Sequence, residues 1–200
     1  MASFTFSENI ILEDNDILLR PLQRDDFNHL LHFAKEEPEL WKYSLVQANS
    51  EENLINYIDL SLDGRASEKE YPFIVFDKIN NEYAGSTRFY DIQLTNQTLQ
   101  LGYTWYGNKF QGTGLNKRCK FLLLEFAFEK LGIERVEFRA DNDNKRSIAA
   151  MKSIGCQIEG ILRSNGKREN GSRRDSIVLS ILKDEWQTNV KNTLLKKIEK

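Results

Sequence analysis

Residues 111–116, with the sequence QGTGLN, have the composition of a loop that binds an anion. The loop lies between an aromatic run with the pattern of a strand, residues 99–106, and a long apolar run with the spacing of a helix, residues 115–131. Glycines let the backbone turn sharply and come close to a ligand. The start of a helix offers unpaired N–H groups and the positive end of the helix dipole. The segment therefore predicts a binding site for phosphate groups.

Two common phosphate-binding loops do not fit this segment. In a Walker loop a lysine follows the last glycine. Here Gly107 and Gly112 have the required separation, but Thr113 follows. A dinucleotide-binding fingerprint needs a third glycine where Lys117 stands. A third pattern, Gln/Arg-x-x-Gly-x-Gly/Ala, does fit, with Asn116 in place of its last glycine or alanine. A tight turn that is rich in glycine by chance is the alternative.

This third pattern resembles the pyrophosphate loop of the GCN5-related N-acetyltransferase (GNAT) superfamily, whose members bind acetyl-coenzyme A (acetyl-CoA). The resemblance covers most of the chain, from about residue 10 to residue 187. Residues 144–147 (NKRS), with Gly155 as a stop, are similar to the Asn-x-x-Ser helix of the superfamily. Further similarities, to the branch that includes ribosomal-protein N-terminal alanine acetyltransferases and spermidine acetyltransferases, lie in residues 159–163, Arg174-Asp175 and Glu185-Trp186.

Composition indicates one globular domain. The chain has 200 residues, 40% of them hydrophobic, and a chain of this length can bury a full core. We expect residues 1–187 to form a single acetyltransferase domain. We expect residues 188–200 to form a C-terminal helical tail that docks on this domain or on the second subunit of a homodimer. A formal net charge of −2 gives no indication of nucleic-acid binding.

Cysteine usage and hydropathy bear on the location of the protein. Cys119 and Cys156 lie in apolar-patterned segments, which indicates buried free thiols and a reducing compartment. The first nine residues lack the basic and apolar regions of a signal peptide. No apolar stretch approaches the length of a membrane span. We therefore expect a cytoplasmic protein with no membrane partner.

Hydrophobic periodicity predicts an α/β architecture. A strand at residues 17–21 precedes two helices; the first begins at Asp25 or Asp26 and stops at Pro38, and the second is capped by Ser50 and ends at Gly64. The remaining elements are strands 73–76, 84–92 and 99–106, a helix 115–131, a strand 134–140, a helix 144–154, and a closing strand pair 156–162 and 176–182. This order predicts a mixed, mostly antiparallel central sheet flanked by helices. The resemblance implies that the sheet splays between its fourth and fifth strands and that the coenzyme fills the gap.

The resemblance also implies which residues bind acetyl-CoA. The loop amides would hold the diphosphate, the backbone of the fourth strand would pair with the pantetheine arm, and Asn144 would hydrogen-bond to that arm. The implied coenzyme-binding residues are Tyr103, Thr104, Trp105, Gln111, Gly112, Thr113, Gly114, Leu115, Asn116 and Asn144. The alternative for Asn144 is a simple helix N-cap, and for the Tyr103 and Trp105 side chains it is ordinary core packing.

Ser147 is the implied catalytic residue, because a serine at this place in the branch donates a proton to the departing sulfur. Many other members use a tyrosine where Met151 stands, and methionine has no proton to donate. Gln100 occupies the position at which some relatives have a glutamate base, and it has no titratable proton. The acceptor amine would lose its proton to water, to another carboxylate such as Asp91 or Glu159, or before it binds.

The other polar and aromatic candidates give weaker indications of function. His29 and His32 fit exposed positions of the first helix, and no His/Cys cluster has metal-ligand spacing, so we expect no metal. Trp41 and Tyr43 fall in the segment that lines the acceptor pocket in the superfamily. A hydrophobic cluster under a loop is the alternative for both.

Two functions remain from the sequence. The first is transfer of an acetyl group from acetyl-CoA to a primary amine, on a protein N-terminus or a small molecule. The second is a non-catalytic acetyl-CoA-binding sensor or partner domain, which Gln100 and Met151 favour. Ser147 and the single-domain length favour the enzyme.

Overall fold

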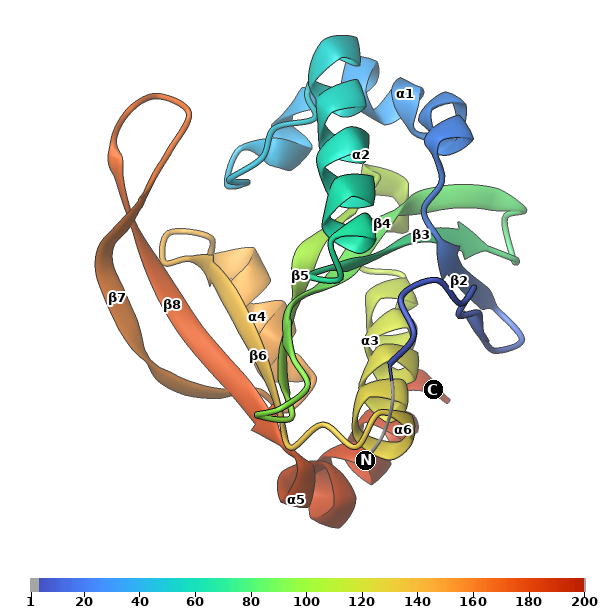
Figure 1. Ribbon diagram of the computed structural model, residues 1–200, viewed down its shortest axis with the longest axis vertical. Helices are drawn as coiled ribbons and strands as arrows, with labels where there is room; N and C mark the ends of the chain where they lie inside the picture. The colour runs from blue at the N-terminus through green and yellow to red at the C-terminus, as the bar shows by residue number, and fades with distance from the viewer. Residues whose placement is uncertain (1–3, 200) are drawn as a thin grey trace.

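The chain folds around an eight-stranded mixed sheet, and the computed structural model describes residues 4–199 (Figure 1). Residues 1–3 and Lys200, at the ends of the expected domain and tail, lie outside the described residues. The strands lie in the order β1-β2-β3-β4-β5-β6-β8-β7. All neighbours are antiparallel except β5 and β6, which confirms the predicted mixed, mostly antiparallel α/β sheet. The strands are β1 (Leu12–Glu13), β2 (Ile17–Pro21), β3 (Tyr71–Asp77), β4 (Glu82–Gln93), β5 (Thr98–Tyr106), β6 (Arg135–Asp141), β7 (Gln157–Lys167) and β8 (Arg173–Leu182).

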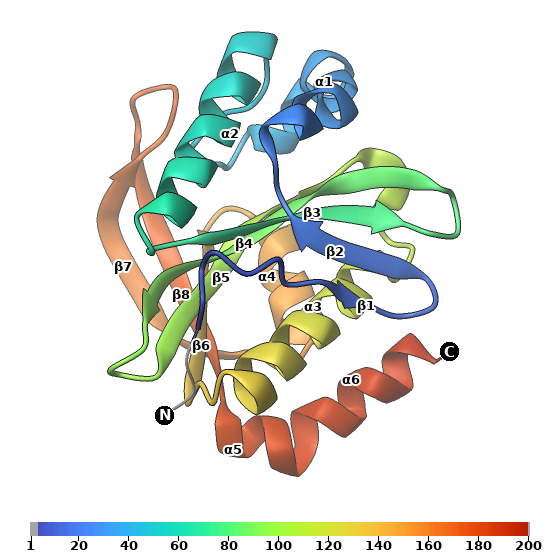
Figure 2. The ribbon, with the colours of Figure 1, turned by 45° about the vertical axis from the view of Figure 1, so that its right-hand side comes forward.

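Helices cover both faces of the sheet. The helices are α1 (Phe27–Glu36), α2 (Glu51–Ala66), α3 (Leu115–Glu125), α4 (Lys145–Ser153), α5 (Lys183–Glu185) and α6 (Lys191–Ile198). Figure 2 shows α1 and α2 above the strands β2 to β5 and α3 below them. Helix α4 packs against β6, in the second half of the sheet. The predicted order of elements is confirmed.

The structure differs from the predicted elements in several places. Ser50 caps α2 through its Oγ, which accepts from the Asn53 N–H at 3.1 Å, but the helix continues past Gly64 to Ala66. Strand β1, of two residues, was not predicted because it is too short for a periodic pattern. Strands β7 and β8 form a longer hairpin than expected, since the tip of β7 is exposed and polar and carries no apolar alternation.

The sheet opens between its two halves. Strands β5 and β6 pair in parallel only from Thr98↔Arg135 to Gln100↔Glu137. After these pairs β6 continues beside β8 as far as Asp141↔Ser176, whereas β5 continues beside β4. The rest of β5 therefore has one free edge. This confirms the predicted splay, because β5 and β6 are the fourth and fifth strands of the prediction, which omitted β1.

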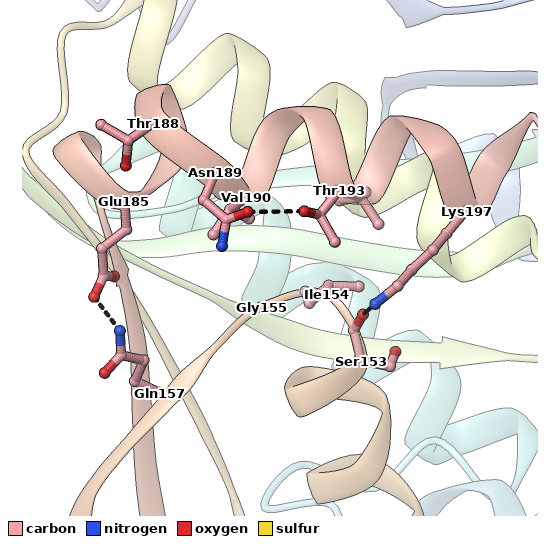
Figure 3. Close-up of a pocket in the computed structure, with 11 residues that line it drawn as sticks. Ser153, Ile154, Gly155, Gln157, Glu185, Thr188, Asn189, Val190, Thr193 and Lys197 are labelled. Carbon is pink, nitrogen blue, oxygen red and sulfur yellow. Dashed lines mark hydrogen bonds between the residues drawn. The ribbon is translucent and has the colours of Figure 1, made fainter.

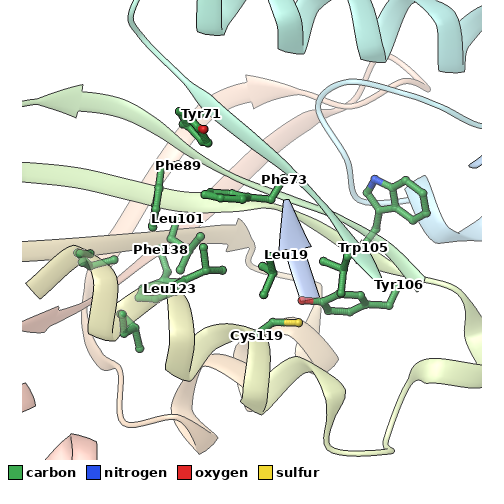
Figure 4. Packing of buried hydrophobic residues seen from close by; sticks show 14 of the residues in the cluster. Leu19, Tyr71, Phe73, Phe89, Leu101, Trp105, Tyr106, Cys119, Leu123 and Phe138 are labelled. Carbon is green, nitrogen blue, oxygen red and sulfur yellow. The ribbon is translucent and has the colours of Figure 1, made fainter. Parts of the chain in front are cut away.

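The main core lies on both sides of β5. Trp105 points toward α1 and α2 and packs on Trp41 with ring centroids 5.0 Å apart and on Phe33 at 5.5 Å. Its neighbour Tyr106 points the other way, toward Cys119 of α3 (Figure 4). Both cysteines, Cys119 and Cys156, are buried and free, as predicted. The alternation of a strand thus fixes β5 between two helical layers.

The C-terminal helix docks on its own chain. It begins at Lys183, passes through a π-helical turn at Trp186–Val190, and ends at Ile198. The fully buried Trp186 stacks on Phe128, and its indole N–H donates to the Glu129 carboxylate at 2.9 Å. Lys197 Nζ reaches across a shallow groove of about 250 Å³ to the Ser153 carbonyl at 2.7 Å (Figure 3). The helix crosses residue 187 without a break and packs against α3.

Candidate functional site

A cavity of about 450 Å³ lies where β5 and β6 diverge. Its walls come from β5, β6, β8, the start of α3, α4 and the segment before α2 that contains residues 40–45. Eight of the eleven residues predicted for the site line this cavity: Tyr103, Thr104, Trp105, Gln111, Gly112, Asn116, Asn144 and Ser147. Thr113, Gly114 and Leu115 do not line it, and Leu115 is buried in the core. Segments far apart in the sequence thus meet at one hollow.

The loop between β5 and α3 has the conformation of an anion site. Gly112 and Gly114 have φ values of +79° and +96°, which L side chains rarely adopt, and a Cβ on either would meet no atom within 4 Å. Gly114 is the N-cap of α3. Among the described residues, no acceptor meets the amides of Gly112, Thr113, Gly114 or Asn116. Unpaired amides in open space at a helix start suit a phosphate.

Side chains hold this loop in place. Gln111 Nε2 donates to the Tyr106 carbonyl at 2.9 Å, and Gln111 Oε1 accepts from the Arg146 guanidinium of α4. Thr113 Oγ1 donates to the Phe110 carbonyl at 2.8 Å. The polar atoms of Gln111 are therefore used within the protein, and its side chain joins the loop to α4 across the cavity.

The free edge of β5 contains a bulge. The β4–β5 register shifts between Ser86↔Trp105 and Arg88↔Gly102, so two residues of β5, Tyr103 and Thr104, face one residue of β4. Tyr103 has a φ of +49°, which is uncommon for a residue with a large side chain. A bulge redirects backbone groups and often occurs at functional sites. Here it lies on the part of β5 that no longer pairs with β6.

Helix α4 contributes two predicted residues. Asn144 is the helix N-cap, and its Oδ1 accepts from the Ser147 N–H at 3.0 Å. The alternative reading of Asn144 as a cap is therefore confirmed, and its Nδ2 is the atom left for a ligand. The Ser147 Oγ meets no partner among the described residues, and both side chains line the cavity.

The two aromatic residues proposed for an acceptor pocket separate. Tyr43 lines the cavity. Trp41 does not; it is fully buried in the main core against Trp105. Sequence could not separate them, because the segment between α1 and α2 has no periodic pattern.

The carboxylates near the cavity are already engaged. Gln100 lines the cavity and donates to Asp91 Oδ2 at 2.8 Å, whereas Asp91 is exposed outside it. Glu159 also lies outside, and Arg135, followed by Ser180, lowers its pKa, which makes it a weaker base. Asp141 is the one carboxylate among the described lining residues.

Asp141 is held by Arg168. Two hydrogen bonds, at 2.7 and 2.8 Å, join its carboxylate to the Arg168 guanidinium. This contact, above all, lowers the pKa of Asp141. The lining therefore offers no free carboxylate to take a proton from an amine.

Lys120 is a cavity residue that the sequence analysis missed. It lies on α3, is 5% exposed, and donates to Thr104 Oγ1 at 2.7 Å and more weakly to Thr87 Oγ1 at 3.4 Å. No carboxylate lies within ion-pair distance among the described residues. Burial lowers the pKa of the amine to about 8. The available signal was a lysine within a helix whose other positions predict burial on several sides.

The described residues hold neither a metal-binding group of side chains nor a helix that could span a membrane. Within residues 4–199, no group of three or more His, Cys, Asp or Glu side chains could hold a metal ion. No helix in the same range has both the length and the apolar character needed to cross a bilayer.

Comparison with known proteins identifies relatives. The family model for the acetyltransferase (GNAT) domain matches residues 16–157. The uncharacterized N-acetyltransferase p20 of Bacillus licheniformis is 29% identical over 177 residues, covering 85% of this chain and 94% of that protein. Spermidine N(1)-acetyltransferase of Escherichia coli strain K12 is 23% identical, covering 91% and 96%. The crystal structure of a GCN5-related N-acetyltransferase from Brucella melitensis superposes with a TM-score of 0.87, at 22% identity, covering 97% and 87%.

The buried lysine predicts an unusual stability effect. A lysine with a lowered folded-state pKa binds its proton less well when folded, so the ammonium opposes folding below pH 8 and this penalty fades between pH 8 and 10.5. Lys120→Met should therefore raise the free energy of unfolding at pH 7 by on the order of 1–3 kcal/mol. The gain should shrink by pH 10. Urea denaturation at both pH values measures it.

Lys152→Met, at an exposed position of α4, is the matched control and should change stability by less than about 0.5 kcal/mol. A loss of stability in Lys120→Met at pH 7 would show that contacts of the ammonium outweigh its burial.

Proposed function

Because the chain belongs to the GNAT acetyltransferase family, we propose that it moves the acetyl group of acetyl-CoA directly to a primary amine in the cavity between β5 and β6. The observation that carries the proposal is the meeting of an unpaired amide loop and a free, bulged strand edge at one cavity. The first suits a diphosphate, and the second suits a chain of amides such as pantetheine. The two buried free cysteines are compatible with a reducing compartment, and we place the enzyme in the cytoplasm.

Binding of the donor uses mainly backbone. The amides of Gly112, Thr113, Gly114 and Asn116 bind the diphosphate, and the free edge of β5 pairs with the pantetheine arm as an added strand would. Asn144 Nδ2 donates to the same arm from α4, since its Oδ1 is used by the helix cap. Positioning of this kind converts a bimolecular reaction into a step between held groups and supplies a large part of the rate.

The chemistry needs a neutral amine. The neutral amine nitrogen attacks the thioester carbon, the new C–N bond forms, the nitrogen gives up a proton to water, and the C–S bond breaks to release a thiolate. The lining has no free carboxylate, so the amine loses its proton to water. Gln100 in place of a carboxylate therefore does not favour the sensor alternative, because a neutral amine needs no protein base.

Ser147 donates its hydroxyl proton to the thiolate and regains a proton from water. Its Oγ is free of protein partners among the described residues and faces the cavity. Lys120 of α3 also lines the cavity with a pKa of about 8, close to that of an ordinary thiol, and its charge stabilises a nearby thiolate. The two residues thus supply a donor and a cation for one leaving group.

The loop assignment predicts the effect of a side chain at Gly114. Gly114→Val should reduce acetyl-CoA affinity at least tenfold, because valine strains a backbone with φ +96° and fills the open space beside the amides. Isothermal titration calorimetry with acetyl-CoA measures this. Gly171→Val, with a similar φ of +82° at the β7–β8 turn, is the control for strain alone. Equal affinities of Gly114→Val and the parent would refute the loop assignment.

The proton-donor role predicts that Ser147→Ala lowers kcat and leaves acetyl-CoA affinity unchanged. A donor to sulfur acts in the transition state, and a general acid typically contributes about 100- to 10,000-fold. Steady-state thiol release on an accepted amine gives kcat, and calorimetry gives the affinity. Ser153→Ala, further along α4, is the control. An unchanged kcat would remove Ser147 from the mechanism.

The lack of a protein base predicts a pH profile. Below the pKa of the acceptor amine, kcat/KM should rise about tenfold per pH unit, since only the neutral fraction reacts. Gln100→Glu should move this acid limb to lower pH by adding a base to the lining. The pH dependence of kcat/KM, measured for both proteins on one acceptor, tests this prediction. A plateau in the parent that begins well below the amine pKa would show that the protein supplies a base.

A further inference from the structure

We propose that the acceptor is a small amino carboxylate, and that Arg174 of β8 binds its carboxylate. This inference rests on the acetyl transfer proposed above. It names the class of acceptor, which the sequence leaves open.

Arg174 is a buried cation without an anion. It is 6% exposed and lines the cavity. Its Nε donates to Ser176 Oγ at 3.1 Å and its Nη1 to the Tyr43 carbonyl at 3.2 Å. No acceptor meets its Nη2 among the described residues. Both of its hydrogen-bond partners are neutral, so no carboxylate is bonded to the guanidinium among the described residues.

The carboxylate that could pair with Arg174 is already bound by another arginine. Asp141 is the nearby carboxylate, and both of its oxygens are bound by Arg168. Burial accordingly lowers the pKa of Arg174, and Asp141 offsets this only in part. A buried arginine that is not paired with a carboxylate is costly to the fold. A ligand carboxylate would remove that cost, because it fits the planar guanidinium.

The position of Arg174 assigns it to the acceptor and not to the coenzyme. Arg174 lines the cavity together with Tyr90 of β4 and with Tyr103 at the bulge of β5, two rings whose centroids are 5.1 Å apart. The proposed diphosphate site lies beyond the C-terminal end of β5, at residues 112–116, where Arg146 is the neighbouring cation. A carboxylate held by Arg174 would therefore place an attached amine near the bulge.

The segments that lie over the cavity at Arg174 favour a small acceptor. Arg174 itself joins β8 to the carbonyl of Tyr43, in the segment between α1 and α2. In the same region Leu45 packs over Gly166 of β7, where a Cβ would lie 3.6 Å from Leu45 Cδ2. Figure 1 shows the β7–β8 hairpin rising beside this segment. Two segments that contact each other leave little room for a folded protein.

The charge of the lining argues against a polyamine. The cationic side chains of the lining are Lys120, Arg139, Arg146 and Arg174; Arg139 is paired with Glu137, and the one lining carboxylate, Asp141, is paired with Arg168. A polyamine would bring further positive charges next to these groups, and like charges in a low-dielectric site repel strongly. The relative from Escherichia coli is named for spermidine, but this chain matches it at 23% identity only.

The test compares matched acceptors on the full chain. We would measure kcat and KM by thiol release for amino acids, for their carboxamides and for the corresponding decarboxylated amines, with spermidine and a peptide N-terminus as further arms. The parent should prefer the carboxylate over the carboxamide by about 10- to 100-fold in kcat/KM, as expected for hydrogen bonds to a charged group. Preference for spermidine, the peptide or the decarboxylated amine would overturn the inference and leave the proposed function standing.

Substitutions of Arg174 test whether this residue causes the preference for a carboxylate. Arg174→Gln should raise KM for the amino carboxylate about 10- to 100-fold and abolish discrimination against the carboxamide, with kcat on the decarboxylated amine unchanged. Arg174→Lys should restore part of the discrimination. Arg173→Gln, at the exposed neighbouring position, is the control. An equal effect of Arg174→Gln on all three acceptors would refute a role in carboxylate binding.

Two measurements distinguish a failure of the carboxylate-binding inference from a failure of the proposed acetyl transfer. Calorimetry with acetyl-CoA on each variant shows whether the site is intact, and an unchanged affinity in Arg174→Gln excludes a folding defect. Coenzyme binding by the parent without thiol release on any amine would refute the proposed function and the inference together.

Discussion

The end of pairing between β5 and β6 after Gln100↔Glu137 is the constraint on which the rest of the structure depends. A sheet that separates leaves backbone groups without partners, and such groups must find acceptors or donors elsewhere. The two strands tolerate the break because each keeps its other neighbour, β4 on one side and β8 on the other. The core packs both faces of β5 independently, through Trp105 and Tyr106. Strands β4 and β8 therefore hold β5 and β6 apart from the outside, and a substrate can pair with the free backbone groups of β5 in the gap.

Two buried cations of this opening have only neutral hydrogen-bond partners among the described residues. Lys120 and Arg174 are both buried, both lack a carboxylate of their own, and burial lowers the pKa of both. They stand on different walls, one on α3 behind Thr104 and one on β8 beside Tyr43. An uncompensated buried cation costs folding free energy, so its presence is best understood through a ligand that carries negative charge. A thiolate and a carboxylate are the two such groups in the proposed reaction.

Sequence predicts the parts of this protein that depend on local pattern. The order of elements, the glycine loop and the cap at Asn144 follow from periodicity and from residue types at helix ends, and the structure confirms their positions. Lys120 and Arg174 could not be found in this way. Their importance comes from which residues fail to pair with them, and that depends on contacts between α3, β5 and β8. For the same reason Trp41 and Tyr43, two residues apart, end in the core and in the cavity respectively.

A crystal structure of the chain with coenzyme A tests the central claim most directly, because the claim is that the gap in the sheet is the donor site. We predict the pantetheine arm along the free edge of β5 at residues 101–106, with the diphosphate on the amides of Gly112, Thr113, Gly114 and Asn116. The bulge at Tyr103 and Thr104 should lie next to the sulfur. Coenzyme bound elsewhere, with these amides left unpaired, would contradict the account.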